Sequence, residues 1–179
     1  MIGEKPTEGR VRMQLLKVKA GGQVTGVFLS EDIGCLRLHW LGSRSYVCSG
    51  VGCPACVEWP SRWTGFAPVA IEVGSGQQRI HLLEFTESAW TRFDGLRRLE
   101  GHPTLFGWRA SIVRLRNKSP LLIEPIDVCN LERAPVKGTV IYSALATLYG
   151  LPSIGPDETM DLWQERASRL AAHQLEGDV

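Results

Sequence analysis

The sequence predicts a mostly β fold followed by C-terminal helices, and three observations lead to this expectation. Apolar residues alternate through most of the first 128 residues, glycine-containing turns separate these runs, and a helical apolar spacing predominates only after residue 138. The chain has 179 residues with 44% hydrophobic content, which is enough apolar material to build a core.

The first expected strands cover residues 11–19 and 23–30, which flank Gly21-Gly22 and should form a hairpin. We therefore expect residues 1–33 to form an N-terminal arm and hairpin. In the next strand, 35–41, alternation separates two sets of side chains. One face carries Cys35, Arg37 and His39, and the other carries Leu36, Leu38 and Trp40, so Trp40 should be buried.

The later elements are strands 63–73 and 78–85, a helix over 88–99 with Trp90 and Phe93 inward, strands 107–116 and 121–128, and helices 139–150 and 158–175. From residue 34 the order is strand, Cys-rich loop, strand, strand, helix, strand, strand. This is the order of the OB-fold, a partly open five-stranded Greek-key barrel. We expect an OB-like domain over 34–128, with the Cys-rich loop 39–59 between its strands 1 and 2, and a helical, acidic C-terminal extension over 129–179.

The Cys-rich loop contains four residues of the kind that bind soft metals, namely His39, Cys48, Cys53 and Cys56. Cys53 and Cys56 form a CxxC pair, which can bring two thiolates to one ion. The spacing predicts a closed, structural zinc site with these four ligands, and Cys35 is the alternative to His39. A polar loop of this length needs such a tie, because ordering each residue costs roughly 1–2 kcal/mol.

Other roles for these cysteines are less favoured by the sequence. They could be small buried apolar residues or a redox CxxC pair, but no helix of the thioredoxin type follows the motif. No catalytic zinc motif is present, so we do not expect an enzyme. Cys129 lies far from the cluster and is expected to be a free thiol without function.

Aromatic residues and arginines are interleaved in and after the Cys-rich loop. Exposed rings that stack on bases, together with cations that meet phosphates, are how proteins bind single-stranded nucleic acid. The predicted nucleic-acid-binding residues are Tyr46, Trp59, Trp63, Arg62, Arg79, Arg109 and Arg114.

The pattern His39-x8-Cys48-x4-Cys53-x2-Cys56 within a predicted OB-fold resembles the zinc-bearing single-stranded-DNA-binding proteins of T4-type phages. The resemblance covers about residues 34–127 and rests on ligand type, ligand order and strand order, while the ligand spacing here is shorter. It implies sequence-nonspecific binding of single-stranded DNA, or of RNA, in replication or recombination of a phage, plasmid or other mobile element. It also implies that the acidic C-terminal region recruits a replication protein.

The charge distribution and the absence of long apolar runs bear on the localisation and the partners of the protein. Residues 141–179 carry two arginines against six acidic residues, whereas the rest of the chain is mildly basic. No signal-peptide run or long apolar stretch is present, and clustered cysteines suit a reducing compartment, so we expect a cytoplasmic protein without a membrane partner. The alternative function is a zinc-stapled protein–protein adaptor that does not bind nucleic acid.

Overall fold

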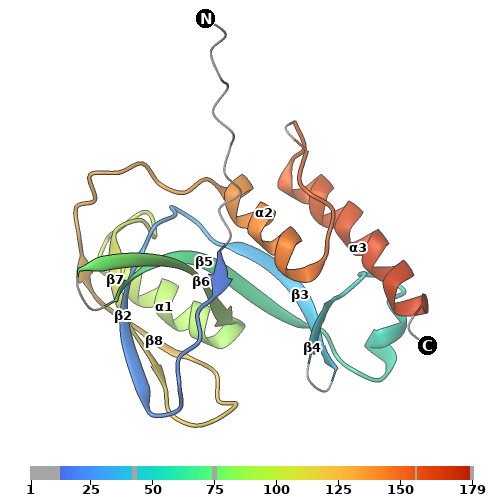
Figure 1. Ribbon diagram of the computed structural model, residues 1–179, viewed down its shortest axis with the longest axis horizontal. Helices are drawn as coiled ribbons and strands as arrows, with labels where there is room; N and C mark the ends of the chain where they lie inside the picture. The colour runs from blue at the N-terminus through green and yellow to red at the C-terminus, as the bar shows by residue number, and fades with distance from the viewer. Residues whose placement is uncertain (1–12, 42–43, 74–75, 156, 178–179) are drawn as a thin grey trace, which may run out of the picture.

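The computed structural model describes residues 13–41, 44–73, 76–155 and 157–177. It confirms a mostly β protein with helices at its C-terminus (Figure 1). The elements, in chain order, are β1 (Gln14–Leu15), β2 (Gly22–Phe28), β3 (Gly34–Leu41), β4 (Arg44–Val47), the 3-10 helix η1 (Pro54–Val57), β5 (Arg62–Val73), β6 (Gln77–Thr86), α1 (Glu87–Leu99), β7 (Trp108–Arg114), β8 (Leu122–Val128), α2 (Gly138–Tyr149) and α3 (Met160–Gly177).

All of these strands belong to one sheet organised around the long strand β5. One edge of β5 pairs with β6, and the other pairs with β3 near the start of β5 and with β2 near its end. β7 pairs with β2, and β8 pairs with β7, with a register shift beside Arg109. Among the described residues β6 and β8 do not pair, so the sheet is not closed into a barrel.

Among the described residues 13–30, the strand pairing of the expected N-terminal hairpin is not formed. β1 instead pairs in parallel with β6, and the backbone N–H of Leu16 continues this contact by donating to the carbonyl of Leu82 at 2.9 Å. β7 occupies one edge of β2 from Gly22 to Val27, and β5 occupies the other edge from Gly26 to Phe28. Residues 1–12 of the expected N-terminal arm lie outside the described residues.

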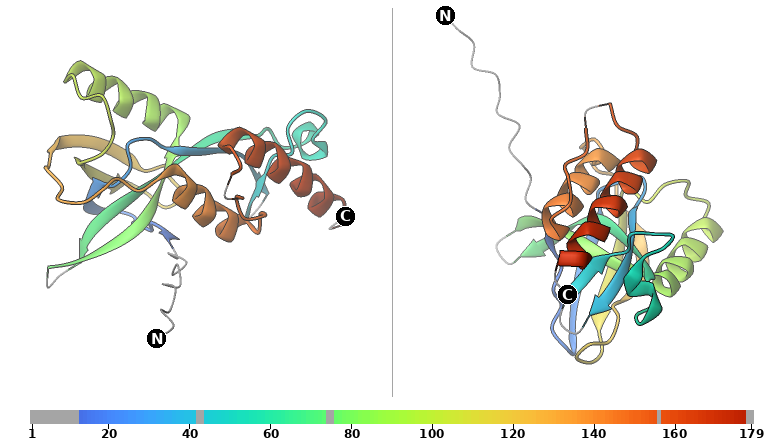
Figure 2. Two further views of the ribbon diagram at one scale, coloured as in Figure 1. Left: turned by 90° about the horizontal axis from the view of Figure 1, so that it is seen from above. Right: turned by 90° about the vertical axis from the view of Figure 1, so that its right-hand side faces the viewer.

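Two apolar clusters lie on opposite faces of the sheet, and each is covered by helix (Figure 2). α1 covers one face and inserts Phe93 among Phe28, Phe85 and Trp108. α2 and α3 cover the other face, where Ile141 and Leu145 pack in one cluster with residues of β3, β5 and β6. Each cluster is a separate hydrophobic layer, so the strands between them are buried on both sides.

The acidic C-terminal helix is part of this packing. In α3 the side chains of Trp163 and Ala167 are 0% and 1% exposed, and the Trp163 indole N–H donates to the carbonyl of Pro152 at 2.7 Å. The helix therefore docks on the body of the protein. None of the described helices is both long enough and apolar enough to cross a membrane.

Candidate metal centre and its surroundings

One histidine and three cysteines converge at the end of the sheet. The ligand atoms of His39, Cys48, Cys53 and Cys56 all lie within 4.8 Å of one another. Four donors at the corners of a tetrahedron, with metal bonds of about 2.0–2.3 Å, lie about 3.4–3.8 Å apart. The Cys48 and Cys56 sulfurs are 3.6 Å apart, and His39 Nε2 lies 3.3 Å from Cys53 Sγ and 3.7 Å from Cys56 Sγ. These separations fit a four-coordinate metal site.

The local fold explains why the ligands meet. His39 projects from β3 and is fixed by the sheet, and β4 then returns antiparallel to β3, placing Cys48 beside it. Gly50 and Gly52 have φ angles of +86° and +81°, a conformation that residues with a side chain rarely adopt. These two glycines turn the chain back toward the cluster. Cys53 is the N-cap of η1 and Cys56 lies within it, so one short turn presents both cysteines.

The orientation of His39 suits a ligand role. Its ring is fully buried, and Nδ1 lies 2.6 Å from the carbonyl oxygen of Trp59, so Nδ1–H donates to that carbonyl. The proton on Nδ1 leaves the lone pair of Nε2 directed at the sulfurs. A second partner of this kind is what usually fixes the tautomer of a metal-binding histidine.

The thiols differ in their environments. Burial alone would raise the pKa of Cys53, but hydrogen bonds from Ser49, His39 and Ala55 together lower it to about 6. Burial and the neighbouring Cys48 and Cys53 raise the pKa of Cys56. The backbone N–H of Gly50 also donates to Cys48 Sγ at 3.4 Å. The hydrogen-bonding groups around Cys53 thus support thiolate charge at that residue.

The two other cysteines lie outside the cluster. Cys35 is on the same strand as His39, but its thiol lies near Gln164 of α3, with 3.9 Å between Gln164 Nε2 and Cys35 Sγ. Its backbone is also tied to the helices, because Cys35 N–H donates to the Tyr142 hydroxyl. Cys129 follows β8 and is a free thiol. The structure therefore favours His39 over Cys35 as the fourth ligand.

Three of the predicted aromatic residues gather around this centre. Tyr46 is the cross-strand partner of His39, Trp63 is the cross-strand partner of Arg37, and Trp59 supplies the carbonyl that His39 contacts. Directly opposed residues share a face of the sheet, so Tyr46, Arg37 and Trp63 lie on the face that carries His39. We call Arg37, Tyr46, Trp59 and Trp63 the metal-end platform.

The position of the Trp63 ring depends on the absence of a side chain at Gly65. A Cβ atom at Gly65 would lie 2.6 Å from Cη2 of Trp63 and 3.0 Å from Cδ1 of Ile33. The indole therefore lies across Gly65 and is only partly exposed, whereas Trp59 is 44% exposed. Arg37 was not among the predicted binding residues, although its alternation with His39 along the strand indicates the shared face.

The structure disperses the remaining predicted residues. Arg62 is exposed beside the platform, but it lies on the opposite face of β5 from Trp63. Arg79 is exposed on β6 opposite Ile71, near the far end of β5. Arg109 forms an ion pair with Asp127 across β7 and β8, and Arg114 donates from Nη1 to the Ser119 carbonyl at 2.9 Å. These arginines and the platform do not form one continuous groove.

Trp40 corrects one sequence-based expectation. It shares a face with Leu36 and Leu38, as alternation requires, but it is 63% exposed whereas both leucines are 6% exposed. The leucines pack in one cluster with residues of α2 and α3, and Trp40 lies outside that cluster near the end of β3. Alternation gave the correct face, but the helices that cover it do not extend to this position.

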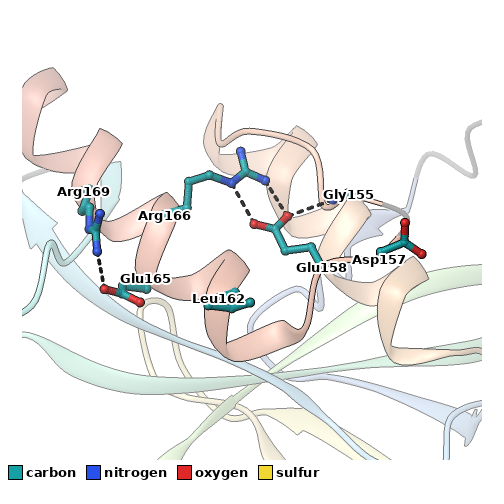
Figure 3. Close-up of a pocket in the computed structure, with 7 residues that line it drawn as sticks. All are labelled: Gly155, Asp157, Glu158, Leu162, Glu165, Arg166 and Arg169. Carbon is teal, nitrogen blue, oxygen red and sulfur yellow. Dashed lines mark hydrogen bonds and ion pairs between the residues drawn. The ribbon is translucent and has the colours of Figure 1, made fainter.

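A surface depression lies along α3 and is lined by none of the four clustered residues (Figure 3). Its two arginines are already neutralised, because Arg166 pairs with Glu158 and Arg169 pairs with Glu165. The arrangement ties the segment before α3 to the helix and leaves neither guanidinium unpaired. We therefore assign it a structural role.

No family model, no curated protein and no solved structure matches this chain, so its function is inferred from the geometry of the site.

Proposed function

We propose that this protein binds single-stranded nucleic acid on a surface held in place by a structural zinc ion. The observation that carries the proposal is the gathering of Arg37, Tyr46 and Trp63 on the sheet face that holds His39, with Trp59 beside them. Rings that can stack on bases, set beside a cation for the phosphates, suit an unpaired strand. A duplex hides its base faces and would bind less well.

Zinc is the metal we infer for the cluster. One imidazole nitrogen and three thiolates in tetrahedral reach form a common structural zinc donor set, and no position is left open for catalysis. Binding energy on the order of 10 kcal/mol can order a segment that has little core of its own. Residues 44–61, which we call the metal segment, have few buried apolar residues, namely Val47, Cys48, Cys53 and Ala55.

The strand order supports an OB-like architecture for this proposal. The strands follow the order of a five-stranded Greek-key barrel if β2 and β3 together count as strand 1 and β5, β6, β7 and β8 count as strands 2 to 5. α1 lies between β6 and β7, and a seam is open between β6 and β8. The metal segment then connects strands 1 and 2, one of the places where such folds hold ligands. The resemblance to phage single-stranded-DNA-binding proteins extends the proposal to DNA replication or recombination of a mobile element, in a reducing cytoplasm, with the exposed Asp161 of α3 available to a replication partner.

The experiment is a titration of fluorescein-labelled oligo(dT) with the wild type and with Trp63→Ala and Trp40→Ala. Stacking is worth about 1–3 kcal/mol per base, so Trp63→Ala should weaken binding roughly 5- to 150-fold. Trp40→Ala is the matched control, because Trp40 is an exposed tryptophan on the opposite face of β3. Oligo(U) in parallel separates DNA from RNA preference. Equal losses in both variants would contradict a role for the metal-end platform.

One observation favours a second candidate, the protein–protein adaptor. Val51 and Val57 on the metal segment are 108% and 86% exposed, and Trp40 is nearby in sequence on β3. Exposed apolar side chains on a rigid segment suit a protein partner. Absence of oligonucleotide binding at low salt would make this the leading function.

A further inference from the structure

Two β-turns lie side by side at the end of the sheet where β2 begins and β7 ends. In the first, Gly22 N–H donates to the Lys19 carbonyl at 2.9 Å, and Gly21 takes the positive φ, +73°, that such a turn needs at its third residue. Its Gly21 N–H donates to the Arg114 carbonyl at 2.7 Å. We call segments 17–22 and 114–119 together the basic turns.

The basic turns carry five cations and no carboxylate, namely Lys17, Lys19, Arg114, Arg116 and Lys118. Val18 is buried in the core, so Lys17 and Lys19 on either side of it project into solvent. Arg114 is partly buried and interacts electrostatically with Glu84. The other four cations are exposed, and within the described part of the chain none of the four forms an ion pair.

The second turn is held rigidly. Ser119 Oγ donates to the Arg116 carbonyl at 2.8 Å and accepts from Arg116 N–H, while Ser119 N–H also donates to the Arg116 carbonyl. Arg114 Nη1 also donates to the Ser119 carbonyl. Arg116 and Lys118 are therefore held on a backbone fixed by these hydrogen bonds, which lowers the entropic cost of binding a charged partner.

Lys118 occupies a position that a glycine would fill at lower cost. Its φ is +63°, and it is the only non-glycine residue with a positive φ among those described. Such a backbone is strained for an L-residue with a side chain. A lysine side chain at this place is therefore retained against a local conformational penalty, which points to a use for its charge.

We propose that the basic turns bind the phosphates of a nucleic-acid strand, at a site separate from the metal-end platform. The inference rests on the proposed function, and it adds a second contact near the opposite end of β5 from Trp63. Four cations without ion pairs, on turns whose own segments 17–22 and 114–119 contain no aromatic residue, fit the backbone of the strand and not its bases. Binding there is sequence-independent and strongly dependent on salt.

The test compares Arg116→Gln/Lys118→Gln with the control Arg133→Gln/Lys137→Gln, which removes the same charge from exposed positions that form no described ion pair. Labelled oligo(dT) is titrated at several salt concentrations. Each phosphate contact contributes about 0.7 to the slope of log affinity against log salt, so the slope should fall by about 1.4 in the first variant, with roughly 25-fold weaker binding at 0.1 M salt. The control should leave the slope unchanged.

The variant Lys118→Gly distinguishes an effect on oligonucleotide binding from an effect on stability. Glycine relieves the strained φ, so the midpoint of thermal unfolding should rise while oligonucleotide affinity falls. Unchanged affinity and slope in the Arg116/Lys118 variant, with Trp63→Ala still impaired, would overturn this inference and leave the proposed function standing. Failure of the wild type to bind any oligonucleotide would overturn both.

Discussion

At the scale of single residues, His39 joins two parts of the chain. Its Nδ1–H holds the backbone after the CxxC pair through the Trp59 carbonyl, while Nε2 faces the sulfurs. Loss of the imidazole removes both the fourth donor and the tie to Trp59. The ring therefore has a second role beside its place in the cluster, because it also fixes where the metal segment re-enters the sheet.

This arrangement predicts the metal content of two variants. His39→Ala should lower zinc affinity by more than the roughly 10- to 100-fold that loss of an outer hydrogen-bond partner costs. Cys35→Ser, on the same face of the same strand, should keep full affinity because its thiol points to Gln164. Elemental analysis and competition with a chromophoric chelator measure both. Zinc loss in Cys35→Ser with retention in His39→Ala would show that the ligand set is wrong.

At the scale of elements, α3 is fastened by an ion pair as well as by its apolar stripe. Arg166 holds Glu158 with two hydrogen bonds, and Glu158 also accepts from Gly155 N–H at 2.9 Å. The guanidinium and this N–H lower the pKa of Glu158 from 4.5 to about 2. The carboxylate thus favours the folded state above pH 4.5, and this contribution is lost as the pH falls toward 2.

Glu158→Gln should therefore lower the thermal midpoint at pH 7, and this effect should have largely vanished at about pH 2. The gap between the two melting curves should close between pH 4.5 and about 2, because in that window Glu158 is protonated in the unfolded chain but still largely ionised in the folded one. Differential scanning fluorimetry across this pH range provides the measurement, and Asp157→Asn, an exposed neighbour, is the control. A gap that stays constant down to pH 2 would contradict the assignment.

The sequence predicts most element positions, because strands 35–41, 63–73 and 78–85 and the helix 88–99 each carry a clear local period. It also predicts the clustering of His39 with Cys48, Cys53 and Cys56, because soft-metal donors at this spacing favour one common site. It does not predict β4 or the parallel pairing of β1 with β6. Both depend on which strand edge is free, and that is decided by segments distant in the sequence. The exposure of Trp40 likewise depends on where α2 and α3 end.

At the scale of the whole molecule, the two covered faces of the sheet make the C-terminal helices part of one folding unit. Trp163 lies against Tyr142 with ring centroids 5.0 Å apart, and Gln164 bonds both the Tyr142 hydroxyl and the Cys35 carbonyl. The acidic extension inferred from composition is therefore attached through buried contacts. A partner would meet only its outer face.

Trp163→Ala should lower the free energy of unfolding by about 3–5 kcal/mol, the usual cost of removing a buried aromatic side chain. Leu162→Ala, one residue earlier and 55% exposed, should change it by about 0.5 kcal/mol or less. Chemical denaturation of both variants at fixed zinc concentration gives the comparison. Similar stability of Trp163→Ala and the wild type would mean that α3 does not dock as described.

The open seam beside β8 has a consequence for aggregation. In the described part of the chain β8 pairs on one side only, so its other edge presents backbone groups to which a second molecule could add a strand. Pro125 in the middle of β8 lacks an N–H, the register shift beside Arg109 bends the ladder, and Glu124 adds charge. These features blunt the edge, so a second copy should add a strand there less readily than to a regular edge strand.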